Sequence, residues 1–109
     1  MGVIDDISAR AVQAADLDLA RLRALAHPVR LGMLRALAAS PETCACDFTE
    51  LFAVSQPTIS QHLKVLREAG LVRTRRQGTQ IYYSIADDAL GAVAESIAGL
   101  TTPRPPGGL

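Results

Sequence analysis

Residues 47–70, DFTELFAVSQPTISQHLKVLREAG, read as two helices separated by only the three residues AVS. Asp47 is a good N-cap for the first helix, and Glu50 three residues later completes a capping box. Ser55 is a good N-cap for the second helix, Pro57 suits its first turn, and Gly70 ends it. The apolar side chains expected on the inner face of the first helix are Phe48, Leu51 and Phe52. Two helices joined by so short a turn predict a helix-turn-helix.

A β-hairpin is predicted directly after these helices. Residues 71–86, LVRTRRQGTQIYYSIA, contain two β-rich runs on either side of Gln77-Gly78-Thr79. Gly78 supplies the positive φ that a tight hairpin turn requires. A helix-turn-helix followed by a hairpin is a winged helix, so we expect a mainly α fold with a β-hairpin wing.

Three more helices are expected, over residues 3–26, 28–39 and 87–100. Asp16 is a good N-cap for the apolar part of the first, Pro28 suits the first turn of the second, and Asp87 or Asp88 caps the last. Their apolar faces comprise Leu17, Leu19, Leu22 and Leu25, then Val29, Leu31, Met33, Leu34 and Leu37, and finally Leu90, Val93, Ala94, Ile97 and Leu100. Residues 1–100 are therefore predicted to form one winged-helix domain. Residues 101–109, TTPRPPGGL, are predicted to be a disordered tail.

The charge of the chain is zero overall but unevenly distributed. Residues 1–20 contain four Asp and one Arg, whereas residues 64–76 contain one Lys and four Arg against one Glu. A local basic patch favours contact with phosphates even when the net charge is zero.

No apolar run approaches the roughly 20 residues of a membrane span, and the N-terminus does not resemble a secretory signal. We therefore expect a cytoplasmic protein with no membrane partner.

The second helix of the helix-turn-helix has a polar, largely uncharged outer face. If Ile59, Leu63 and Leu66 point inward, the residues left to face outward or lie on the flanks are Gln56, Pro57, Thr58, Ser60, Gln61, His62 and Lys64. Such side chains can read base edges in a major groove, while Arg75 and Arg76 in the hairpin contact phosphates or the minor groove. The alternative is an ordinary amphipathic helix with a solvated face. The short turn and the basic hairpin favour binding of double-stranded DNA.

The chain has two cysteines, Cys44 and Cys46, just before the helix-turn-helix. At this spacing they form a poor disulfide framework, so they are expected to stay as thiols in a reducing compartment. One interpretation is an ion site, because thiolates bind soft ions, and a helix N-terminus is expected to lower their pKa. The other is that they are ordinary small buried residues.

The chain shows no Ser/His/Asp constellation, phosphate-binding glycine loop or CxxC pair, so we expect that it is not an enzyme.

Three segments, ALAHPVRLGMLRAL, CACDFTELFAVSQPTISQHLKVLREAGLV and RRQGTQIYYSI, resemble the arsenic- and metal-responsive repressors of the ArsR/SmtB family. The resemblance extends over residues 22–87. It implies a homodimeric winged helix whose first and last helices form the dimer interface, and which leaves its operator when a metal or metalloid binds. It also implies that Cys44 and Cys46 are the ligands of a thiophilic ion such as As(III), with no other cofactor required.

The chain departs from the family patterns at several ligand positions. Thr49 occupies the position at which the arsenic pattern has a third cysteine. Residues 1–43 contain none of the cysteines that the cadmium pattern adds from the N-terminal arm. On the last helix Asp87 matches one ligand, but the histidine positions of the zinc, cobalt or nickel site are Ala89, Leu100 and Pro103. The sequence therefore leaves two alternatives for the third ligand of the thiol site. It is either an outside ligand such as hydroxide or glutathione, or a residue of the chain such as Glu50 or His27.

The predicted function is a repressor that is released from DNA when an ion such as arsenite binds the thiols. Two sulfurs at this spacing are expected to point apart, so one shared ion would twist the backbone around Ala45. The alternative is a regulator of the same family that senses nickel, zinc or cadmium, or that responds to no ion and acts with a partner protein or by thiol oxidation.

Overall fold

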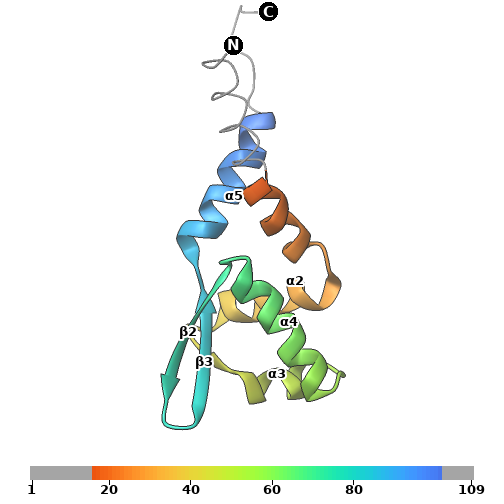
Figure 1. The fold of residues 1–109 in the computed structure, drawn as a ribbon, viewed down its shortest axis with the longest axis vertical. Coiled ribbons are helices and arrows are strands. Elements are labelled where there is room, and N and C mark those ends of the chain that lie inside the picture. The colour runs from red at the N-terminus through yellow and green to blue at the C-terminus, as the bar shows by residue number, and fades with distance from the viewer. Residues whose placement is uncertain (1–15, 102–109) are drawn as a thin grey trace, which may run out of the picture.

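The computed structural model describes residues 16–101, and it has the architecture of a winged helix-turn-helix (Figure 1). Residues 16–25 are helical, and the elements that follow are α2 (Pro28–Ala39), β1 (Thr43–Cys44), α3 (Ala45–Leu51), α4 (Gln56–Glu68), β2 (Val72–Gln77), β3 (Gln80–Ile85) and α5 (Asp87–Leu100). The strands form one antiparallel sheet in the order β1-β3-β2. Residues 102–109 of the predicted tail and the part of the first predicted helix before Asp16 lie outside the described residues, whereas Thr101, the first residue of that tail, is the C-cap of α5.

Local signals begin and end most of these elements where they were predicted. Pro28 occupies the first turn of α2, and Nδ1 of His27 accepts a hydrogen bond from the Val29 amide at 3.1 Å. Gly70 has a φ of +76°, which lets the chain reverse after α4 while the Leu71 amide bonds to the Leu66 carbonyl at 3.0 Å. Gly78 has a φ of +64° in the hairpin turn, as predicted.

Three predicted caps are wrong. Asp47 lies in the first turn of α3, whose N-cap is Cys44, because pairing of β1 with β3 keeps the chain extended up to Cys44. Asp87 and Asp88 also lie inside their helix, whose N-cap is Ala86, and the Ala86 amide is held by the Leu71 carbonyl at 3.0 Å. Asp16 is already within the first helical segment. For α3 and α5, tertiary pairing, and not the local preference of an acidic side chain, determines where the helix begins.

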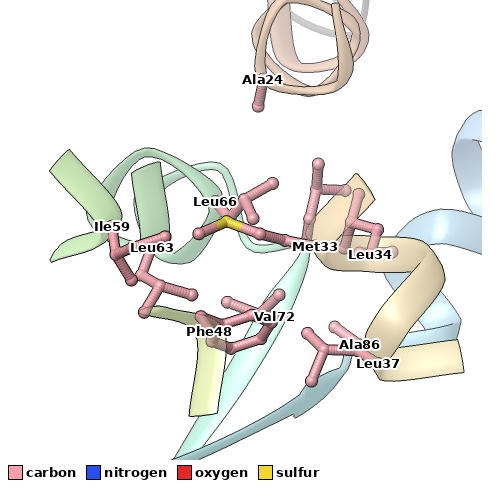
Figure 2. Packing of buried hydrophobic residues seen from close by; sticks show 12 residues of the cluster. Ala24, Met33, Leu34, Leu37, Phe48, Ile59, Leu63, Leu66, Val72 and Ala86 are labelled. Carbon is pink, nitrogen blue, oxygen red and sulfur yellow. The ribbon is translucent and has the colours of Figure 1, made fainter. Parts of the chain in front are cut away.

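The core lies between α2, α3, α4 and the base of the wing (Figure 2). Its largest fully buried side chains are Phe48, Met33, Ile59, Leu63, Leu66 and Leu71. The predicted inner face of α4 is therefore confirmed. The predicted inner position of Leu51 on α3 is wrong, because Leu51 is 61% exposed, and Leu31 at the edge of the apolar face of α2 is 38% exposed. The seven-residue α3 turns only Phe48 fully into the core, and Phe52, just after it, packs partly against the same cluster.

The helical segment 16–25 and α5 lie side by side at the end of the molecule opposite the wing (Figure 1). Ser96 on α5 donates a hydrogen bond to Asp18 at 3.0 Å. Val93 is buried, but much of the apolar surface of this helix pair is open to solvent, at Leu17, Leu19, Leu22, Ile97 and Leu100. Among residues 16–101 no helix is both long enough and apolar enough to cross a membrane.

Candidate DNA interface and thiol site

The outer face of α4 presents the polar side chains that were predicted to read DNA. The exposed residues on it are Gln56, Pro57, Thr58, Ser60, Gln61 and Lys64. Ser55 is the N-cap by position, but its Oγ lies 3.0 Å from Oγ1 of Thr58 instead of bonding to a backbone amide. This face has the donors, acceptors and apolar groups that match base edges in a major groove.

His62 lies apart from this exposed face. It is half-buried on the flank of α4, with its ring centroid 4.5 Å from that of His27 and its Nδ1 3.3 Å from the Arg30 guanidinium. Partial burial, followed by the nearby His27 and the positive charge of Arg30, lowers the pKa of His62 below its ordinary value. Because the guanidinium can only donate, a neutral His62 accepts from it and links α4 to the start of α2.

The two wing arginines that were predicted to contact DNA differ in their surroundings. Both carboxylate oxygens of Glu42 lie 2.8 Å from the Arg75 guanidinium, which also donates to Gln77 and stacks over the Tyr82 ring. This pairing raises the pKa of Arg75 and lowers that of Glu42. Within residues 16–101, Arg76 is exposed and forms no ion pair. Arg73, on the same strand, pairs with Asp88.

We therefore expect Arg76→Ala to weaken operator and random DNA alike and to reduce the slope of log affinity against log salt by about 0.9. Arg75→Ala is the matched variant on the same strand, and it is expected to change this slope much less because Glu42 already neutralises its charge. Fluorescence anisotropy at several salt concentrations measures both slopes. Equal slopes for the two variants would show that Arg75 leaves Glu42 on DNA.

The two thiols lie together at the start of α3. Cys44 is buried and Cys46 is exposed, and both are free thiols. The Cys46 thiol donates to Cys44 Sγ at 2.6 Å, and the Cys44 thiol donates to Oε1 of Gln80 at 2.6 Å. The expectation that the sulfurs point apart is wrong. As the N-cap, Cys44 turns its sulfur back toward the first turn of α3, where it also accepts from the Cys46 amide at 3.4 Å.

The surroundings of Cys46 raise its pKa, in contrast to the predicted effect of a helix N-terminus. The largest cause of the raised pKa is the hydrogen bond to Cys44, followed by partial desolvation of the thiol and by the negative charges of Cys44 and Asp47. The protonated thiol is therefore the favoured form of the resting site. A thiophilic ion has to displace this proton when it binds.

The residues that were considered as third ligands do not join the thiols. Thr49, at the third cysteine position of the arsenic pattern, donates its hydroxyl to the Cys46 carbonyl at 2.7 Å. Glu50 is exposed, and His27 serves as the N-cap of α2. In the described part of the chain, no three His, Cys, Asp or Glu side chains are grouped to hold a metal ion. The side chain that does meet the sulfurs is Gln80, which sequence reasoning missed because only the β1–β3 pairing brings it there.

Comparison with known proteins identifies the family. Residues 27–74 match the family model described as "Bacterial regulatory protein, arsR family". The chain is 43% identical over 76 residues to the biofilm growth-associated repressor of Agrobacterium fabrum, covering 70% of this chain and 64% of that protein. It is 37% identical over 78 residues to the arsenical resistance operon repressor of Bacillus subtilis, covering 71% of this chain and 74% of that protein.

A solved structure supports the same relationship. The transcriptional repressor BigR from Xylella fastidiosa superimposes with a TM-score of 0.59 at 34% identity, over 92% of this chain and 97% of that one. The exposed polar face of α4, the wing and these matches agree with one another. The chain belongs to the ArsR family of bacterial regulatory proteins, whose members are DNA-binding transcriptional regulators and not enzymes.

Proposed function

We propose that this ArsR-family regulator is a homodimeric repressor that leaves its operator when a thiophilic ion, arsenite being our first choice, binds Cys44 and Cys46. The observation that carries the proposal is the pair of free sulfurs 2.6 Å apart at the first turn of α3. Arsenous acid condenses with two thiols, forming two arsenic–sulfur bonds and releasing two waters with no change in oxidation state. The name of the Bacillus relative supports arsenic as the signal.

The position of the thiols supports a direct effect on DNA binding. Cys44 and Cys46 flank the first residue of α3, and only residues 52–55 separate α3 from α4. Phe48 of α3 packs in the same buried cluster as Ile59 and Leu63 of α4. A change at the start of α3 therefore has a short path to the outer face of α4.

The dimer is expected to appear as a species of about 23 kDa, twice the 11.5 kDa chain, in analytical ultracentrifugation at micromolar concentration. The reason is the exposed apolar surface of α5, at the end of the molecule opposite the wing, where Ile97 is 45% exposed and Leu100 is 86% exposed. Ile97→Asp should shift the protein toward a monomer, whereas Leu51→Asp, an exposed position on α3, should not. Finding only an 11.5 kDa species of the unmodified chain contradicts the dimer.

The thiol variants test the inducer site. Arsenite should lower the operator affinity of the unmodified protein at least tenfold, which corresponds to about 1.4 kcal/mol of coupling. Cys44→Ser and Cys46→Ser should bind the operator normally and change less than twofold with arsenite, because serine does not form the arsenic–sulfur bonds. Nickel serves as the control ion, since Ala89 and Leu100 stand where the family has histidines. Release of both variants by arsenite, to the same extent as the unmodified protein, sinks the proposal.

A further inference from the structure

We propose that Gln80 of the wing is the third donor of the thiol site, and that Cys44, Cys46 and Gln80 together bind a divalent thiophilic cation such as zinc, cadmium or lead. The inference rests on the proposed function only in using the same two thiols. Zinc and cadmium were already alternatives from the sequence, so the new element is the third ligand, which comes from the hairpin.

Three donor atoms converge at this point. Oε1 of Gln80 lies 2.6 Å from Cys44 Sγ and 3.8 Å from Cys46 Sγ, and the two sulfurs lie 2.6 Å apart. The sheet register explains the meeting, because Cys44 pairs with Tyr82 and Gln80 lies two residues before Tyr82 on the same face of β3. A cross-strand diagonal of this kind brings long side chains into contact. Two thiolates and an amide oxygen then leave the fourth position of a tetrahedral ion to water.

The charge around the site favours a cation. Oδ1 of Asp47 lies 4.0 Å from Cys46 Sγ, on the exposed side of the pair. When a cation displaces both thiol protons, the two thiolates and this carboxylate place three negative charges around it. With a divalent cation bound, the net charge of the site is −1. Arsenous acid is neutral, so its binding is not favoured by the charge of Asp47. Two protons are released for each cation bound, and no electron transfer is involved.

The resting geometry needs only a small change to hold such an ion. Metal–sulfur bonds of about 2.3 Å at a tetrahedral angle place two sulfurs about 3.8 Å apart. Cys44 is buried and fixed as the N-cap of α3, whereas Cys46 is exposed and has room to rotate outward. The incoming ion therefore meets Cys46 first and then the Cys44–Gln80 pair.

A ligand on the wing connects the ion to DNA binding by a second path. Gln80 is the first residue of β3, next to the hairpin turn, and Glu42 just before β1 holds Arg75 of β2. An ion held by the thiol segment and Gln80 therefore links the start of α3 directly to the wing.

A cadmium titration of the full-length chain tests the assignment, read as the ultraviolet thiolate-to-cadmium charge-transfer band in competition with a chelator. The unmodified protein should bind one cadmium per chain. Gln80→Leu should lower the affinity at least tenfold, whereas Gln80→Glu should match or exceed the unmodified protein because a carboxylate oxygen replaces the amide oxygen. Gln77→Leu is the control on the same hairpin, since Gln77 accepts from Arg75 and is expected to leave cadmium affinity unchanged.

Three results would overturn the inference: no cadmium binding to the unmodified protein, a Gln80→Leu affinity within twofold of it, or a Gln80→Glu affinity as low as that of Gln80→Leu. Arsenite-driven release from the operator is measured separately. If arsenite does not release the protein from the operator but the cadmium affinities of the variants are as expected, only the arsenite proposal is rejected. If arsenite releases the protein but the cadmium affinities are not as expected, only the role of Gln80 is rejected.

Discussion

Replacing Phe48 with alanine is expected to lower the free energy of unfolding by about 3–5 kcal/mol, which is a large part of the stability of a small domain. The ring is fully buried and packs among Met33, Ile59 and Leu63 (Figure 2). Removing the ring leaves a cavity in the core between α3 and α4, and the loss of buried apolar contacts adds to the cost of that cavity. Urea denaturation followed by circular dichroism, at one fixed protein concentration, measures the change.

Leu51→Ala is the matched control, because it shortens another apolar side chain on the same helix. Leu51 is 61% exposed, so this change is expected to cost less than about 0.5 kcal/mol. A comparable loss in both variants would mean that a partner surface covers Leu51. A loss below about 1 kcal/mol for Phe48→Ala would show that the core refills the space.

Sequence reasoning predicted the helices, the wing and the inner face of α4 because local chemistry determines them. Pro28 begins a helix, Gly70 ends one, and Gly78 permits the hairpin turn, whatever the rest of the chain does. The spacing of Ile59, Leu63 and Leu66 allows only one face of α4 to be buried. These signals act over a few residues, so they are readable without the fold.

The thiol site was predicted only in part, because its geometry depends on distant segments. The two-residue β1 has no sequence signal of its own, and its pairing with β3 moves the helix start from the predicted Asp47 to Ala45. The same pairing brings Gln80 to Cys44 across 36 positions of sequence. The Glu42–Arg75 ion pair has the same origin, so a charge count along the chain overestimated the free cations of the wing.

The exposed face of α4 makes the most specific prediction about DNA. Gln61→Ala and Thr58→Ala should each cost roughly 1–3 kcal/mol on the operator, recovered beforehand by selection from random duplexes, and little on unrelated DNA. The reason is that a side-chain amide or hydroxyl recognises a base edge but adds no charge to hold phosphate. Gln61 gives the cleaner test, because Thr58 also contacts the Ser55 hydroxyl at 3.0 Å and its loss alters the start of α4.

Lys64→Ala provides the contrast on the same helix. Lys64 is exposed and positively charged, so its loss should weaken operator and unrelated DNA by similar factors and lower the salt dependence of both. Gln61→Ala should leave the salt dependence unchanged while removing the preference for the operator. Anisotropy titrations of both variants against both duplexes, at two salt concentrations, separate base recognition from phosphate contact. If Gln61→Ala binds the operator as tightly as the unmodified protein, another face of α4 enters the groove.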